Sequence, residues 1–166
     1  MVGSKEYSLS MEKENIGLQQ AKANLETTLK ENLMKGNIDN IQVNRDFTKV
    51  ITQGVQGAGI AVDNSSGSPV FDIKGSVEKF KAVQKVYQDS LKNVVENAVG
   101  TKSLAVPGMK STLKTLALAS QKYLQPIDPR KNNLSKSDYI VGQTYKTNNG
   151  LMLWTGSVDT SIKIAD

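Results

Sequence analysis

Residues 10–35 read SMEKENIGLQQAKANLETTLKENLMK, and this stretch predicts a long amphipathic helix. Apolar residues recur in it at steps of three and four, the spacing that places side chains on one face of a helix. They are Leu18, Ala21, Leu25, Leu29 and Leu33. Gly36 follows the last lysine, and a glycine there can adopt the left-handed conformation that ends a helix.

Two further helices are predicted on the same grounds. The first runs from about Ser76 to Ala98, with the Ser76 hydroxyl as its N-cap. The second follows Pro107 and must end before Pro126, because proline cannot continue a helix. We expect these two helices to form an antiparallel pair, joined by residues 100–108.

Extended structure is predicted on both sides of the first helix. Residues 1–9 contain Val2, Tyr7 and Leu9, which suit a short half-buried strand. Residues 38–52 are rich in β-branched and aromatic types and predict one or two strands. The glycines in residues 54–59 favour a flexible loop or a strand turn, so that residues 53–70 form an irregular excursion.

The C-terminal third predicts a loop and then a hairpin. Prolines and asparagines favour a loop over residues 125–137. Residues 139–146 and 151–158 read as strands around Asn148-Asn149-Gly150, and a last strand can follow through Ile162 and Ile164.

The expected fold is therefore one α+β domain over residues 1–166. In it, an antiparallel sheet of four to six strands packs on about three amphipathic helices. The residues that we expect to be buried are Leu18, Leu25, Leu29, Phe80, Tyr87, Leu91, Leu113 and Leu124.

Composition argues against catalysis. The 166 residues include no His and no Cys, which removes the imidazole base, the thiolate nucleophile and the usual zinc ligands. No run of acidic residues has calcium-loop spacing, and Asp63 to Gly67 reads as a turn. We therefore expect no enzyme activity, no cofactor and no metal.

Three patterns that could carry chemistry are explained more simply. The glycines of residues 54–59 lack the spacing of a phosphate-binding loop. Ser111 and Lys114 match the S-x-x-K spacing of some hydrolases, but the partner motifs are missing and Lys114 is expected to be solvated. A glycosidase needs only two carboxylates, but the sequence singles out no such pair. Aromatic residues, which commonly line carbohydrate clefts, make up only 5% of the chain.

Candidate partner-binding residues lie in the C-terminal third. Arg130 and Lys131 form a basic cluster in the predicted loop, which could meet an acidic partner. Trp154 is the only tryptophan and falls in the predicted hairpin, where half-buried packing is the simpler interpretation.

The two ends of the chain resemble a known family. Gln20-Ala21-Lys22-Ala23-Asn24-Leu25, and near the C-terminus Gly150-Leu151-Met152-Leu153-Trp154, are similar to segments of small bacterial envelope lipoproteins. These are the lipoproteins of the Helicobacter LPP type and the flagella-associated FlgP- and FlgT-like proteins. The chain has no counterpart of the family's lipid-bearing Cys. The resemblance implies a sheet wrapped on a long helix, an extracytoplasmic location in the periplasm or at the outer membrane, and a ring-forming or surface-associated role.

The expected function is non-enzymatic assembly, with the chain self-associating or binding protein partners in a cell-envelope or flagellum-associated structure. The alternative is a bacteriophage virion component of the tail or head-completion type, because long loops and an absence of Cys also suit such proteins. A basic nucleic-acid-binding module is a second alternative, suggested by the net charge of +5. Nucleic acid is the less favoured partner because only two of the 21 basic residues are arginines. We expect no small-molecule substrate and no transmembrane segment, since no apolar run reaches the roughly 18 residues that a membrane span needs.

Overall fold

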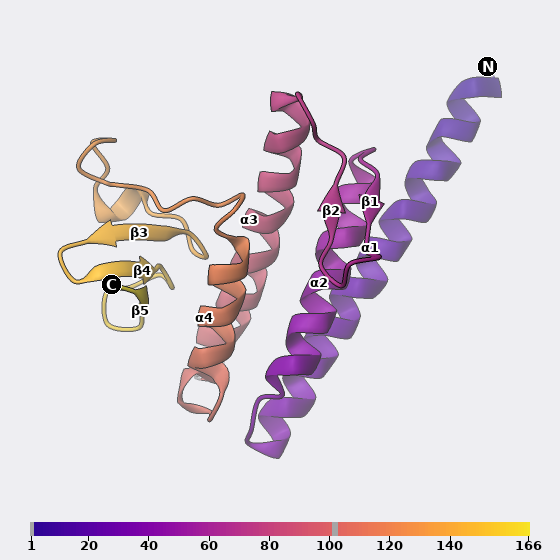
Figure 1. Ribbon diagram of the computed structural model, residues 1–166. Coiled ribbons are helices and arrows are strands. Elements are labelled where there is room, and N and C mark those ends of the chain that lie inside the picture. The colour runs from indigo at the N-terminus through magenta and orange to yellow at the C-terminus, as the bar shows by residue number, and fades with distance from the viewer. Residues whose placement is uncertain (1, 101–102) are drawn as a thin grey trace.

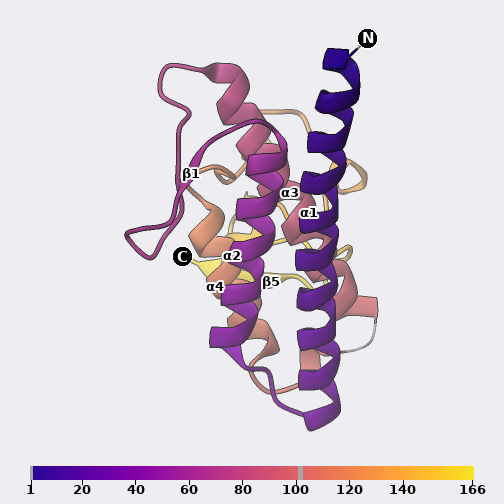
Figure 2. The same ribbon diagram turned by 90° about the vertical axis from the view of Figure 1, so that its right-hand side faces the viewer.

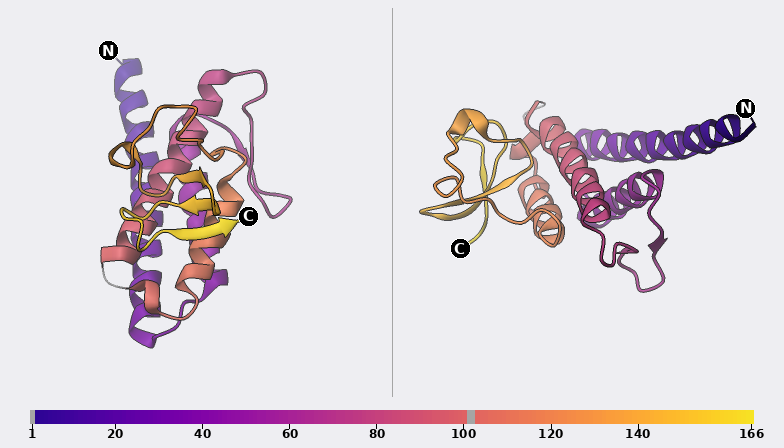
Figure 3. Two further views of the ribbon diagram at one scale, coloured as in Figure 1. Left: turned by 90° about the vertical axis from the view of Figure 1, so that its left-hand side faces the viewer. Right: turned by 90° about the horizontal axis from the view of Figure 1, so that it is seen from above.

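The computed structural model describes the backbone of residues 2–100 and 103–166, and the side chains of residues 16–99 and 104–166. The described chain is α+β, with four α-helices and two small antiparallel sheets of two and three strands. Helices α3 and α4 lie between the α1–α2 pair and the three-stranded sheet (Figures 1 and 3). No helix in the described part of the chain has the length and hydropathy to cross a bilayer.

Helix α1 (Val2–Lys35) and helix α2 (Asn40–Gly57) pack side by side as an antiparallel hairpin (Figure 2). The predicted end of the first helix is confirmed, because α1 stops at Lys35 and Gly36 has a φ of 78°. The apolar face of α1 is buried at Ala21, Leu25 and Leu29, and hydrophobic burial of this kind holds the two helices together.

Two of the predicted strand regions are helical. Residues 2–9 belong to α1, and residues 40–52 belong to α2, so the strands predicted over 1–9 and 38–52 are wrong. In α2, the buried residues Val43, Phe47, Val50 and Val55 follow helical spacing, and this packing overrides the β-preference of the individual residues. Met1 lies outside the described residues.

The irregular excursion is also shorter than the sequence predicted. Residues 54–57 form the last turn of α2, so a flexible loop is wrong there, and Ala58 caps the end of the helix. Beyond it, β1 (Val62–Asp63) and β2 (Val70–Phe71) pair in a small hairpin. The turn predicted at Asp63 to Gly67 joins these strands, and the Asp63 carboxylate accepts a hydrogen bond from the Ser65 amide at 2.9 Å.

The two later helices follow the prediction closely. Helix α3 (Val77–Gly100) begins with the predicted N-cap, since the Lys79 amide donates to the Ser76 hydroxyl at 3.1 Å. Helix α4 (Met109–Ser120) follows Pro107 and ends ahead of Pro126. A short 3-10 turn, η1 (Ser103–Ala105), precedes α4, and the two helices run antiparallel (Figure 1).

The largest sheet has three strands, fewer than the four to six predicted. They are β3 (Thr144–Thr147), β4 (Gly150–Leu153) and β5 (Ile162–Ala165), in sequence order. The predicted hairpin is confirmed in a shortened form, because residues 139–143 and 154–158 are not strand. Gly150 has a φ of 110°, and a side chain there would strike the Ala165 carbonyl on β5.

The segment between α4 and the sheet is mostly loop, as predicted for residues 125–137. A 3-10 turn, η2 (Lys136–Asp138), closes it, and Ile127 forms an isolated bridge with Tyr145. The sheet contacts α4 through β5. Its β-strands therefore pack on the inner helices, and the sheet does not wrap α1.

One continuous core joins the helices to the sheet. Six of the eight residues expected in the core are buried, while Leu18 and Phe80 are half-buried and pack at its edge. Five aromatic rings gather where α2, α3 and the β1–β2 hairpin meet the end of α4. They are Phe47, Phe71, Phe80, Tyr87 and Tyr123.

Candidate functional site

An open groove of about 1120 Å³ extends along both sides of α2. Its walls come from α1, α2 and the β1–β2 hairpin, with Tyr87 of α3 and the end of α4 with the residues that follow it. It is broad and open to solvent, so it suits an extended partner more than an enclosed small molecule.

Three cations line the groove. Arg45 and Lys49 lie four residues apart on α2, which places them on one face of that helix, and Lys122 follows the end of α4. All three are exposed, and none forms an ion pair with a side chain that the structure describes. No Asp or Glu among the described residues lines the groove.

The remaining polar lining consists of side-chain amides and hydroxyls. Gln20 and Asn24 come from α1, and Asn44, Thr48 and Gln53 come from α2. An amide can donate and accept hydrogen bonds, whereas the cations only donate. The groove therefore combines net positive charge with groups that can pair with a peptide backbone.

Tyrosines form part of the groove lining. Tyr87 and Tyr123 stack with ring centroids 5.2 Å apart and planes at 15°, and Lys122 lies 5.7 Å above the Tyr123 ring. Burial raises the pKa of Tyr87 to about 12, with a further contribution from Tyr123, and burial also raises the pKa of Tyr123. Both phenols are therefore neutral at physiological pH and can act as hydrogen-bond donors.

One buried carboxylate fixes the wall between α1 and α2. Asp46 is 5% exposed and accepts hydrogen bonds from the Thr28 hydroxyl at 2.5 Å and from the side-chain amide of Gln42 at 2.9 Å. Asp46 does not line the groove. The hydrogen bond from Thr28 holds α2 against α1. Arg45 and Lys49 lie close to Asp46 on α2, so this contact also fixes their position.

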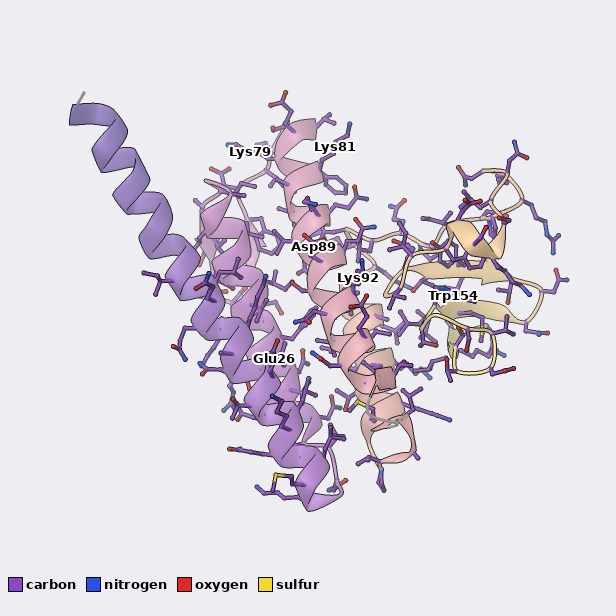
Figure 4. The ribbon with its side chains drawn as sticks, turned by 180° about the vertical axis from the view of Figure 1, so that it is seen from behind. Glu26, Lys79, Lys81, Asp89, Lys92 and Trp154 are labelled. Atoms are coloured by element: carbon purple, nitrogen blue, oxygen red, sulfur yellow. The ribbon has the colours of Figure 1, made fainter. Side chains whose placement is uncertain are left out.

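The structure separates the partner-binding residues predicted from sequence. The Arg130 guanidinium donates a hydrogen bond to the Asn148 side chain at the β3–β4 turn, and Lys131 is exposed beside it. Trp154 follows β4, at the other end of the hairpin (Figure 4). Arg130 and Trp154 are thus not brought into one site, and their binding role stays a prediction.

Trp154 takes part in an aromatic cluster of the sheet. It is half-buried and packs edge-on against Tyr139, with ring centroids 5.0 Å apart. Tyr139 in turn stacks on Tyr145 at 4.0 Å. This packing agrees with the simpler interpretation of Trp154 as part of a small hydrophobic cluster.

Other chemistry is sparse in the described residues. No group of three or more Asp and Glu side chains there could hold a metal ion. Ser111 donates its hydroxyl hydrogen bond to the Gly108 carbonyl at 3.1 Å, and Lys114 is exposed, so the S-x-x-K pair is solvated as expected.

Sequence reasoning missed the basic groove because it assigned α2 to strands. Arg45 and Lys49 are neighbours only if the segment is helical, because residues four apart lie on one face of a helix. Two signals could have found the helix: Asp39 as an N-cap, whose side chain accepts the Gln42 amide at 3.1 Å, and the four-residue step from Val43 to Phe47.

Comparison with protein families, with curated proteins and with solved structures finds no match to this chain. The groove and the long α1 helix must therefore be interpreted from their own geometry.

Proposed function

We propose that this chain is a non-enzymatic assembly protein that self-associates through the N-terminal half of α1. The observation that carries this proposal is the reach of that helix. Helix α1 has 34 residues and α2 has 18, and α1 extends well beyond the end of α2 (Figures 1 and 3).

The pairing register of the two helices defines the projecting part. Thr28 meets Asp46, and Gly17 lies against the Gln53 side chain close to the C-terminal end of α2. Most of residues 2–16 therefore extend past the end of α2. Because α2 continues for four residues beyond Gln53, its end lies near residue 13 of α1. At 1.5 Å per residue, the part of α1 past that end is about 16 Å long.

A projecting helix of that length gains stability from a partner that covers it. Isolated helices shorter than about 12–15 residues are only marginally stable in water, and most helical stability in proteins comes from packing of an apolar face. Tyr7 and Met11 continue the side of α1 that carries Leu18, at steps of four and seven residues, and Leu9 and Ile16 lie on the opposite side.

A second copy of the chain is the partner that fits best. Residues 2–16 carry two lysines and three glutamates, so two such segments do not repel strongly, although the whole chain has a net charge of +5. Two-fold pairing is also the most common symmetry of soluble oligomers. The resemblance of the chain ends to envelope lipoproteins supports a place in a bacterial envelope or flagellum-associated structure.

The test is a pair of matched double variants. Tyr7→Lys with Met11→Lys adds two charges to the proposed pairing face, while Leu9→Lys with Ile16→Lys adds two charges on the side that the helical period places opposite. Ile16 is 63% exposed in the described structure. We expect light scattering after size exclusion to find the first variant monomeric and the control still associated. Dissociation by the control alone, or by both equally, contradicts pairing through this face.

A further inference from the structure

The basic groove has an excess of hydrogen-bond donors and no anionic counterpart. Arg45, Lys49 and Lys122 are exposed there without an ion pair to any described side chain, and no described carboxylate lines the groove. The ion pairs of the described chain lie elsewhere, on α3 and at the C-terminal end of β5. A surface of this kind is complementary to negative charge.

Positive charge continues from the groove along α4. Lys110 and Lys114 are exposed four residues apart on that helix, which ends two residues before Lys122. Near the start of α4, Lys110 and Lys114 share a small hollow of about 320 Å³ with Lys163 of β5. This hollow shares no lining residue with the groove, and its Lys163 is paired with Asp166, so the exposed Lys110 and Lys114 only add positive charge outside the groove.

We propose that the groove around α2 binds an extended acidic segment of a protein partner. The cations meet the acidic side chains of that segment. The amides of Gln20, Asn24 and Gln53 pair with its backbone, which cations alone could not satisfy. This inference does not depend on pairing of α1, since the residues that carry it lie outside residues 2–16.

The aromatic rings of the groove favour a peptide over nucleic acid as its ligand, because their faces are already covered by other rings. Single-stranded nucleic acid is bound by aromatic faces on which bases stack. Tyr87 and Tyr123 are 7% and 6% exposed, and their faces are used in stacking on each other and in contacts with Phe71. The groove also has only one arginine, the residue that reads phosphates and bases best.

The test is fluorescence anisotropy with a fluorescein-labelled polyglutamate peptide and the full chain. Lys49→Glu with Lys122→Glu reverses two groove charges. Lys79→Glu with Lys81→Glu makes the same change in net charge on exposed residues at the start of α3, away from the groove lining (Figure 4). We expect the groove variant to weaken binding by about tenfold or more and the control by less than about twofold. A milder variant, Lys49→Gln with Lys122→Gln, should give an intermediate loss if the charge reversal disturbs folding.

Three outcomes overturn the proposal. The first is the absence of salt-sensitive binding of polyglutamate. The second is an equal loss in the groove and control variants, which would mean that net charge alone attracts the peptide. The third is tighter binding of a labelled oligothymidylate that is lost with the groove variant, which would make the groove a nucleic-acid site. None of these outcomes bears on self-association, which is measured separately by mass.

Discussion

At the scale of single residues, the site depends on a few buried polar and aromatic groups that the sequence does not distinguish from their neighbours. Asp46 is one of sixteen acidic residues, yet in the described structure its carboxylate joins α2 to Thr28 of α1 and is also held by Gln42 within α2. Tyr87 likewise acquires its raised pKa from burial, which only the packed structure reveals.

Replacing the Asp46 carboxylate should destabilise the helical hairpin. Asp46→Ala leaves the Thr28 hydroxyl without its acceptor in a partly buried interface, and we expect a loss of about 1–3 kcal/mol in the free energy of unfolding. The matched control is Asp89→Ala, which removes an exposed ion pair with Lys85 and should cost at most about 0.5 kcal/mol. Urea unfolding compares the two, and equal losses would contradict the role given to Asp46.

Ionisation of Tyr87 should make stability fall at high pH. Its folded pKa of about 12 is above the ordinary value of 10.0, so the unfolded chain releases this proton first as pH rises. The stability that the neutral phenol contributes is complete below pH 10 and is lost as pH approaches 12. In Tyr87→Phe, unfolding measured across this range should show a smaller loss than in the parent chain. The same loss in both proteins would mean that Tyr87 titrates normally.

At the scale of elements, helix α2 decides both the fold and the groove. The sequence patterns placed α3, α4 and the β3–β4 hairpin correctly, because each has a strong local signal: Ser76 as a cap, prolines near the ends, and a compact turn before Gly150. Segment 40–57 has conflicting signals, since its β-branched residues favour strands while their spacing favours a helix. Packing against α1 and α3 resolves that conflict, and packing is not visible in a local window.

Two glycines of α2 provide a direct check of its helical packing. A methyl group at Gly54 would come within 2.7 Å of a Val86 methyl on α3, whereas one at Gly57 would meet nothing within 4 Å. Gly54→Ala should therefore lower the free energy of unfolding despite the better helix propensity of alanine. Gly57→Ala, at the helix end, should raise it by up to about 0.5 kcal/mol. If both substitutions were stabilising in thermal unfolding, α2 would not pack on α3 as described.

At the scale of the whole molecule, two surfaces are left without a partner in the described chain. One is the projecting N-terminal part of α1, and the other is the basic groove around α2. They lie on different parts of the α1–α2 hairpin, so the geometry allows a chain to pair with a copy of itself and still bind an acidic segment. Such a combination suits a component that is built into a larger structure.

The central claim is that the chain assembles through α1, and sedimentation equilibrium of the full chain over a wide range of concentration tests it most directly. We predict that the mass rises above the 18.0 kDa of one chain as concentration increases. We also predict that the Tyr7→Lys, Met11→Lys variant stays at 18.0 kDa. A parent chain that remains at the mass of one chain at the highest concentration would contradict the claim.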